Sequence, residues 1–276
     1  MESGFLLRRK GKIHYLTIPP FDKTGIVDHC FTTRLGGVSE GVYSQLNLGF
    51  KRGDDQQKVL KNYELICSAI GINYKDLVCS DQIHGDKVYV ATEKDKGKGI
   101  VRESDIIGVD ALITNKPGVP LITYYADCVP IFILDPVKKA IGLCHAGWRG
   151  TVQKIGQKTI LKMEQVFETR PSDCLVGIGP SIGQCCYEVD APVIARLKES
   201  FSNWREMVIE KSEGKWNLDL WKANKYQLEE IGVVESNITV SGLCTSCRND
   251  LFYSYRKEKG VTGSLAAIIQ LKKYNK

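Results

Sequence analysis

The stretch GVPLITYYADCVPIFILDPVKKAIGLCHAGWRG, residues 118–150, carries the clearest structural signal in this chain. Two short apolar runs are interrupted by ADC at residues 126–128, and the dipeptide DP at 135–136 marks a turn into a third run that ends at His145. Apolar runs of this length, bounded by turn residues, are typical of buried strands. The stretch therefore predicts three successive strands with polar residues and glycines at their ends.

Helical and strand-like segments mix irregularly on both sides of this stretch. Apolar residues at helical spacing, with Gly71 as a stop signal and Asp190 as a cap, predict helices at 54–70, 151–167, 190–201 and 221–231. Alternating or continuous apolar runs predict strands at 87–92, 174–180, 237–244 and 264–271. Because strands and helices do not alternate strictly, we expect one α+β domain over residues 1–276, with helices packed on a mixed sheet.

Composition excludes several classes of protein. With 43% hydrophobic and 25% charged residues, the chain matches an ordinary globular protein. Its net charge of +6 is spread along the sequence without a long basic stripe or a known nucleic-acid-binding module, so we expect no nucleic-acid partner. The start lacks the apolar core of a signal peptide, and no run approaches the ~20 apolar residues needed to span a bilayer. We therefore expect a cytoplasmic protein, without membrane contact, whose ten cysteines stay reduced.

Three potential metal ligands stand where predicted strands end or begin: His84 in QIHGDKV, Cys128 in ADCVPIF and His145 in CHAGWRG. A thiolate and two imidazoles leave a fourth tetrahedral position for water or substrate, which is typical of a catalytic zinc site. Taken singly, each residue also fits a plainer role. Cys128 could be a small core residue, and each histidine could bond to the backbone of a loop. The glycines after His145 would keep the backbone clear of the histidine ring.

Longer motifs make the chain resemble the laccase-domain family, also called YfiH-like or multicopper polyphenol oxidase proteins. The matching motifs run nearly the full length of the chain: TTRLGGVSEGVYSQLNLG, QIHGDKV, DALIT, ADCVPIFILDP, CHAGWRGT, GIGPSIGQCCYEV and DLFYSYRKEKGVTGSLAAII. The resemblance implies a three-layer α/β/α arrangement around a mixed sheet. It also implies that the family's three metal ligands fall on His84, Cys128 and His145, which would act in catalysis. Asp127 is a further catalytic candidate because it directly precedes Cys128.

The resemblance further implies zinc-dependent purine nucleoside phosphorolysis. Adenosine, inosine, guanosine or S-methyl-5'-thioadenosine would be split by phosphate into a free base and a ribose 1-phosphate, with adenosine deamination as a side activity. The older family name implies instead a copper-dependent oxidation of phenols. A third alternative is a non-catalytic protein that holds zinc and binds a partner. We expect a monomer or a homodimer.

The chain has too few histidines and methionines for a full set of copper centres. A multicopper oxidase needs many imidazoles, and this chain has four histidines in total. A blue-copper site uses two histidines, a cysteine and usually an axial methionine. The methionines are Met1, Met163 and Met207, and Met163 falls within a predicted helix. A single copper on the Cys-His-His set remains the alternative, because copper outcompetes zinc at most nitrogen and sulfur sites.

Several residues are candidates for binding the substrate and phosphate. Arg34 adjoins two glycines whose backbone N–H groups suit an anion, and Asn47 lies in the same motif. Arg149 and Arg256 are further candidates, although each could equally form a surface salt bridge. Asp127 could orient a ligand histidine, act as a general acid or base, or cap the turn between two strands.

Two cysteine pairs, CC at 185–186 and CTSC at 244–247, admit a four-thiolate zinc site or a redox pair. Nothing in the sequence brings the two pairs together. We therefore expect free thiols or a facultative disulfide rather than a second metal site.

Overall fold

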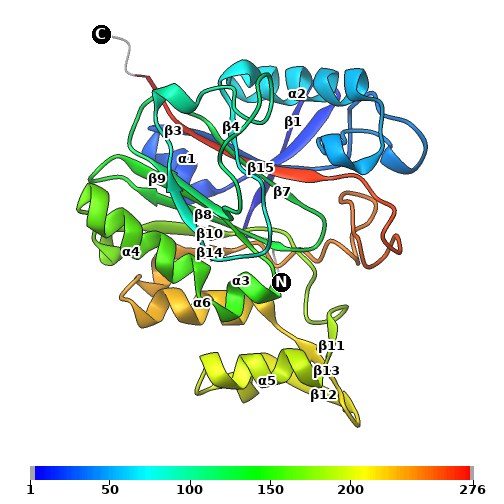
Figure 1. Cartoon of the computed structure of the whole chain (residues 1–276), viewed down its shortest axis with the longest axis vertical. Coiled ribbons are helices and arrows are strands. Elements are labelled where there is room, and N and C mark those ends of the chain that lie inside the picture. Colours follow the sequence, from blue (N-terminus) through cyan, green and yellow to red (C-terminus); the bar gives the residue numbers. More distant parts are fainter. Residues whose placement is uncertain (1–3, 274–276) are drawn as a thin grey trace.

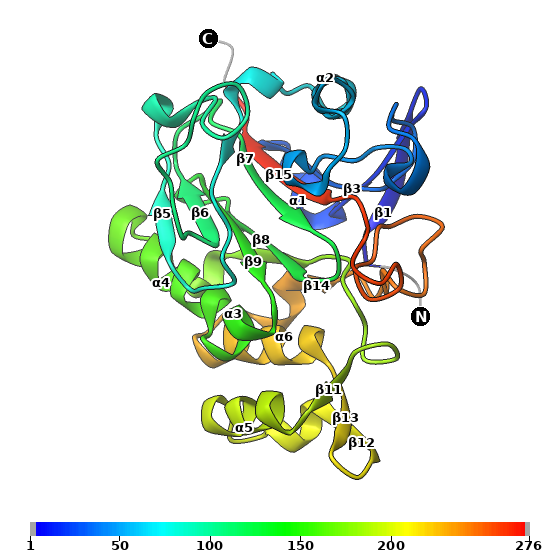
Figure 2. The same cartoon turned by 45° about the vertical axis from the view of Figure 1, so that its right-hand side comes forward.

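Two six-stranded mixed sheets face each other in the computed structural model, which describes residues 4–273 (Figures 1 and 2). The first sheet has the strand order β1-β2-β3-β15-β7-β4, in which only β7 and β4 run parallel. The second has the order β14-β10-β8-β9-β6-β5, with parallel pairs at its two ends. A small antiparallel sheet, β11-β13-β12, lies beyond them.

The elements have the following bounds. The first sheet contains β1 (Leu6–Lys10), β2 (Ile13–Thr17), β3 (Val27–Thr32), β4 (Val78–Cys79), β7 (Leu121–Tyr125) and β15 (Leu265–Leu271). The second contains β5 (Val88–Val90), β6 (Ala111–Thr114), β8 (Val129–Asp135), β9 (Ala140–Ala146), β10 (Leu175–Ile178) and β14 (Ile238–Val240). The small sheet contains β11 (Glu188–Asp190), β12 (Val208–Ser212) and β13 (Lys215–Leu218). The helices are α1 (Pro19–Thr24), α2 (Gln56–Ile70), α3 (Trp148–Val152), α4 (Ile155–Phe167), α5 (Ala191–Ser200) and α6 (Leu220–Glu230).

Alternate residues of β8 explain the layering. Ile131 and Ile133 pack with the helices α4 and α6, whereas Phe132 and Leu134 point into the core between the two sheets. Helix α2 covers the other face of the first sheet (Figures 1 and 2). The predicted α+β architecture is confirmed, and its β layer consists of two stacked sheets. Strand β8 is apolar from Val129 to Leu134 because both of its faces are buried.

The stretch at 118–150 forms three strands, as predicted, but they do not share one sheet. Strands β8 and β9 pair with each other in the second sheet, whereas β7 pairs with β15 in the first. The chain therefore crosses between the sheets at residues 126–128. Asp127 makes this crossing with a φ of 94°, a left-handed conformation that is uncommon outside glycine. Cys128 follows this turn directly and packs, partly buried, against the core between the two sheets.

The predicted helices are present with one interruption. Helix α2 begins after Asp55, whose side chain accepts two backbone N–H groups, and ends at Gly71 with a φ of 77°. The helix expected at 151–167 is instead two helices, α3 and α4, because Lys154 adopts a left-handed φ of 58° between them. Asp190 precedes α5 as expected, but its side chain makes no capping hydrogen bond. No helix within residues 4–273 is long and apolar enough to cross a membrane.

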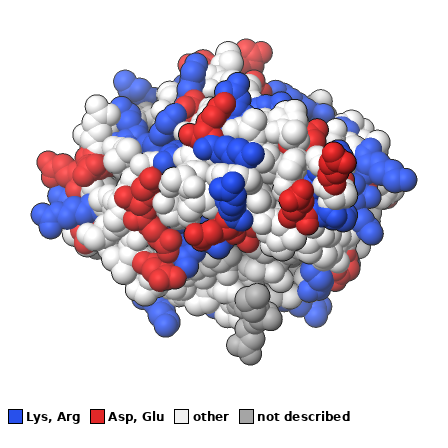
Figure 3. Space-filling model, turned by 90° about the horizontal axis from the view of Figure 1, so that it is seen from below, with Lys and Arg blue, Asp and Glu red and all other residues white. Residues whose placement is uncertain are grey.

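The face seen from below, on the side of α5, carries charges of both signs (Figure 3). Lysine and arginine side chains alternate there with aspartate and glutamate side chains, and no stripe of one sign crosses this face. Exposed ion pairs of the protein include Lys211 with Glu188 and Lys222 with Glu206. Such exposed pairs are worth little in stability and mainly keep the surface polar.

Candidate metal centre

The side chains of His84, Cys128 and His145 converge from three separate segments. His84 precedes β5 in an exposed loop, Cys128 immediately precedes β8, and His145 is buried in β9. Their ligand atoms all lie within 4.8 Å of one another, and the two imidazole ring centroids are 4.8 Å apart. His84 has a left-handed φ of 64°, a conformation that costs about 1–3 kcal/mol and that persists mainly at functional sites. The fold therefore assembles one sulfur and two nitrogen ligands.

A buried carboxylate, Asp110, orients two of these three residues. It accepts a hydrogen bond from Nδ1 of His145 at 2.8 Å, which leaves Nε2 of that ring for a metal. It also accepts the backbone N–H groups of Ile83, His84 and Gly85 at 3.2, 2.9 and 2.7 Å. Asp110 thereby holds both the ring of His145 and the backbone of the His84 loop. Carboxylates in this relation to a ligand histidine are typical of metal centres.

The charges of the site favour metal binding. Burial raises the pKa of the Cys128 thiol, but the imidazoles of His145 and His84 outweigh that effect and lower its pKa to about 6. Burial likewise raises the pKa of Asp110, and the hydrogen bonds from His145 and the backbone bring it below its usual value. A thiolate is the form of cysteine that binds a metal ion. The thiolate form of Cys128 is thus favoured at neutral pH. Burial lowers the pKa of the His145 imidazole, but Cys128 and Asp110 outweigh that effect and raise it to about 9, so this histidine must release a proton when a metal binds.

Gly147 allows the chain to pass directly beside the ligands. A Cβ atom added at this position would lie 2.9 Å from Cδ2 of His84 and 3.1 Å from Sγ of Cys128. The first of these separations is closer than real Cβ atoms approach, so a ligand would have to shift. The prediction that glycine keeps the backbone clear of the site is confirmed at Gly147.

Substituting Gly147→Ala should therefore lower metal affinity and turnover by about 10- to 100-fold, because a displacement below 1 Å at a metal ligand has effects of that size. Metal binding by the purified variant, measured by competition with a chromophoric chelator, checks this expectation. Gly156→Ala is the matched control, since its added Cβ would meet only the ends of flexible side chains, the nearest being Cδ1 of Ile131 at 3.1 Å. Equal affinities in the two variants would contradict the role given to Gly147.

Asp127 is buried and bonded to two other loops rather than to a ligand histidine. One carboxylate oxygen accepts the hydroxyl of Thr245 at 2.6 Å, and the other accepts the backbone N–H of Arg256 at 2.7 Å. Its position next to Cys128 means that these bonds tie the C-terminal loops to the metal ligand. The catalytic role of Asp127 stays a prediction, and its observed bonds favour positioning over proton transfer.

A hollow of about 240 Å³ lies near the ligands, although none of the three lines it. It is lined by Trp148, Tyr187, Glu188, Val189, Asp190, Val193, Lys215 and Arg256. Its lining residue Tyr187 is close enough to Cys128 to feel the charge of that thiolate, and its lining residue Trp148 follows His145 by three positions. The guanidinium of Arg256 lies 5.3 Å from the ring centroid of Tyr187, and that of Arg149 lies 4.5 Å from the ring of Trp148. Within residues 4–273, neither arginine pairs with a carboxylate. Arg256 donates instead to the carbonyl oxygen of Glu188 at 3.2 Å, so its charge stays available to an anion.

Arg34 and Asn47 are engaged elsewhere in the protein. Arg34 donates to the carbonyl oxygens of Ser44 and Asn249, each at 3.0 Å, and pairs with Glu258 at 3.0 Å. Asn47 is fully buried, where its amide donates to Asp54 and its oxygen accepts two backbone N–H groups. The phosphate-binding roles of these two residues stay predictions, and the geometry favours Arg149 and Arg256 over them.

Two residues of the site were not singled out from the sequence. Asp110 is the acidic residue of the DALIT motif and directly precedes an apolar strand. From the local sequence alone, an aspartate in this position could equally be a turn residue. Tyr187 follows the cysteine pair and lies close enough to Cys128 and Asp127 for their charges to raise the pKa of its phenol, after the larger effect of burial. Tyr187 can be recognised as a site residue only from the structure, in which its ring lies beside the guanidinium of Arg256.

A larger hollow of about 380 Å³ lies away from these ligands, over the first sheet. Among its lining residues, His29 accepts the backbone N–H of Ile18 at 2.8 Å, and burial lowers the pKa of this imidazole to about 4. His29 is therefore neutral and structural, and this hollow gathers no metal ligands.

Comparison with known proteins shows the family and the relatives of this chain. A family model described as "Multi-copper polyphenol oxidoreductase laccase" matches residues 28–272. The purine nucleoside phosphorylase YlmD of Geobacillus stearothermophilus is 40% identical over 244 residues, which make up 86% of this chain and 88% of that protein. A protein named adenosine deaminase RL5, from an unknown prokaryotic organism, is 34% identical over 230 residues, or 82% and 87% of the two chains. The crystal structure of YlmD from Geobacillus stearothermophilus superposes with a TM-score of 0.91 and 36% identity, covering 98% of this chain and all of that one.

Proposed function

This chain belongs to the multi-copper polyphenol oxidoreductase laccase family, and from that premise we propose that it is a zinc-dependent purine nucleoside phosphorylase. Its relatives named purine nucleoside phosphorylase support a nucleoside-processing enzyme. The observation that carries the proposal is the Cys-His-His set oriented by Asp110 beside a hollow that offers both aromatic rings and unpaired cations. The substrates would be adenosine, inosine, guanosine or S-methyl-5'-thioadenosine, together with phosphate.

The donor set fits zinc. One thiolate and two imidazoles are the nitrogen and sulfur ligands zinc prefers, and three protein ligands leave a position open, as catalytic zinc sites do. Asp110 fixes the tautomer of His145, which is the arrangement that strengthens a histidine ligand. Zinc held by these residues would supply a Lewis acid at the reacting centre.

The chain's own residues would bind and orient both substrates. The rings of Trp148 and Tyr187 offer flat apolar faces for a purine base, and Arg149 and Arg256 offer guanidinium groups for phosphate. In the reaction a phosphate oxygen forms a bond to C1′ while the bond from C1′ to the base breaks, and the base departs with that electron pair. Holding phosphate on the side of C1′ opposite the base is the positioning that the two arginines would contribute.

Adenosine deamination is a second activity for the same ligands, supported by the relative named adenosine deaminase. In that reaction water replaces the amino group of the base, and no phosphate is required. The presence or absence of phosphate therefore separates the two activities.

Copper-dependent phenol oxidation, favoured by the family's name, is the alternative. Two of the four histidines, His14 and His29, bond to backbone in the first sheet and are separate from the ligand set. The two remaining histidines, His84 and His145, are too few to ligate several copper ions. Oxygen uptake with a phenol that rises in proportion to bound copper would favour this alternative over ours.

We assign the protein to the cytoplasm. All ten cysteines are free, and thiols persist in a reducing compartment.

One assay on metal-quantified protein tests the proposal. Adenosine would be incubated with phosphate, without phosphate, and after zinc removal and zinc return, and the products separated by chromatography. We expect adenine only when both phosphate and zinc are present, and hypoxanthine from inosine under the same conditions. Inosine formed regardless of phosphate would make deamination the principal reaction. No product from either nucleoside would overturn the proposal.

A further inference from the structure

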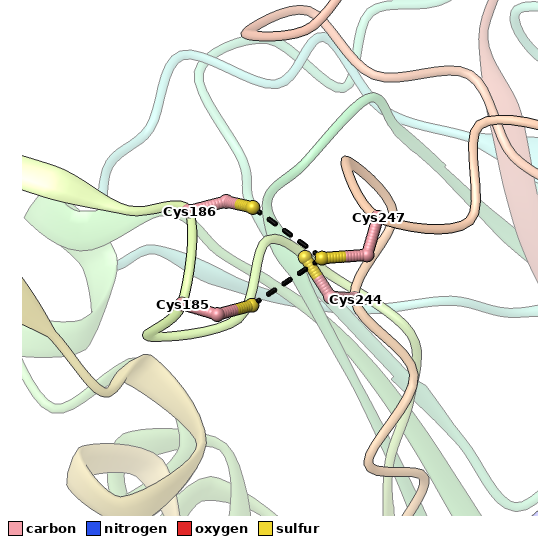
Figure 4. A group of neighbouring side chains, drawn as sticks. All are labelled: Cys185, Cys186, Cys244 and Cys247. Carbon is pink, nitrogen blue, oxygen red and sulfur yellow. Dashed lines mark hydrogen bonds between the residues drawn. The ribbon is translucent and has the colours of Figure 1, made fainter.

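The four cysteines at 185, 186, 244 and 247 come together in a second cluster, separate from the His84, Cys128 and His145 set. Their sulfur atoms all lie within 4.8 Å of one another and point toward a common centre (Figure 4). Sγ of Cys247 is 3.5 Å from that of Cys185 and 3.4 Å from that of Cys186. The fold thus brings together two cysteine pairs that nothing in the sequence connects. The nearest cysteines of the two pairs, Cys186 and Cys244, are 58 positions apart in sequence, and only the fold joins them.

Backbone hydrogen bonds hold the two segments in register, so the convergence does not depend on the side chains alone. The N–H of Ser181 donates to the carbonyl of Leu243, and the N–H of Thr245 donates back to the carbonyl of Ser181. Gly183 donates its N–H to Sγ of Cys244 at 3.2 Å. A Cβ on Gly183 would lie 3.2 Å from Cβ of Cys244 and 3.0 Å from the ring of Trp221, so a glycine lets this segment approach the other closely. The backbone contacts between the two segments therefore hold the four cysteines near one another.

We propose that these four cysteines bind a second zinc ion, in a closed four-thiolate site. Four sulfurs around one zinc at about 2.3 Å form a tetrahedron whose edges are about 3.8 Å, close to the observed separations. Two disulfides would pair the sulfurs separately, whereas here Cys247 approaches both Cys185 and Cys186 equally. The N–H donated to Cys244 is the kind of bond that supports a ligating thiolate. Cys185 and Cys247 are exposed, which gives the metal a path of entry.

Four protein ligands leave no open position, so this zinc is structural. It would clamp the segment that ends in Tyr187 to the segment that contains Thr245 and leads to Arg256. Thr245 bonds to Asp127 beside Cys128, and Arg256 lines the hollow. The second zinc therefore fixes one wall of the hollow. The inference does not depend on which reaction the enzyme performs.

The test uses the Cys128→Ala variant of the full chain, in which the Cys-His-His set is dismantled. We expect about one zinc per chain in this variant against about two in the unaltered protein, by plasma mass spectrometry. X-ray absorption of the variant should show four sulfur neighbours at about 2.3 Å. Adding Cys185→Ser and Cys247→Ser should remove the remaining zinc, whereas adding Cys67→Ala, a buried cysteine in α2, should leave it.

Three outcomes would contradict the four-thiolate site, and a fourth would replace zinc by a different cofactor. The three are a Cys128→Ala variant without metal, a remaining metal with nitrogen neighbours, and a mass deficit showing a disulfide among the four cysteines in freshly purified protein. The fourth, iron with inorganic sulfide, would overturn the zinc site in favour of a cluster. Because the readouts are metal content and ligand type, loss of nucleoside turnover leaves this result unaffected.

Discussion

Cys128→Ala should abolish phosphorolysis and remove the metal from the Cys-His-His set. The thiolate is the charged ligand of that set, and the remaining two imidazoles cannot compensate for the loss of its charge. The fall in turnover should exceed the about 10- to 100-fold that is typical when an outer partner of a metal ligand is removed. Turnover of inosine with phosphate and zinc per chain would be measured on the same preparation.

Cys144→Ala is the matched control for this experiment. Cys144 lies in β9 next to His145, but its sulfur bonds to Thr159 and points away from the ligands. Its loss should leave both zinc content and turnover close to those of the unaltered protein. If Cys128→Ala retained turnover with the zinc gone, the proposed centre would not be the site of reaction.

The strand ends that carry the metal ligands could be predicted from sequence because apolar runs stop abruptly there. The sheet to which each strand belongs could not. Strands β7 and β8 are both apolar and only three residues apart, yet they lie in different sheets, because the left-handed Asp127 turns the chain between them. The local sequence pattern shows that a strand is buried, but it does not show which strands it pairs with or which sheet it joins.

Long-range hydrogen bonds account for the other differences. The glycines beside Arg34 suggested an anion site, but the guanidinium bonds to Asn249 and Glu258, more than 200 residues away. The cysteine pairs likewise meet only through the pairing of residues 181 and 244. In each instance the partner lies in a distant segment whose approach depends on the finished fold.

Asp110→Asn should weaken zinc binding by about 10- to 100-fold and also destabilise the fold. The carboxylate accepts four hydrogen bonds, three from backbone N–H groups and one from His145. An asparagine offers only one acceptor oxygen, and its NH2 group would face N–H donors. Leaving a buried donor without a partner costs about 1–3 kcal/mol. Zinc affinity and the free energy of unfolding in urea would both be measured.

Asp95→Asn separates the two effects. Asp95 is also a buried carboxylate with several donors, among them Thr92, Tyr89 and Lys98, but it is not bonded to a metal ligand. This variant should lose stability while its zinc affinity stays unchanged.

Saturating zinc then distinguishes positioning from chemistry at Asp110. If Asp110 acts through His145, excess zinc should restore most of the turnover of Asp110→Asn, because the ligands themselves are intact. A defect that persists with the site fully loaded would mean that the carboxylate also acts in the reaction. Since Asp110 reaches the site only through His145 and the backbone of residues 83–85, we expect restoration.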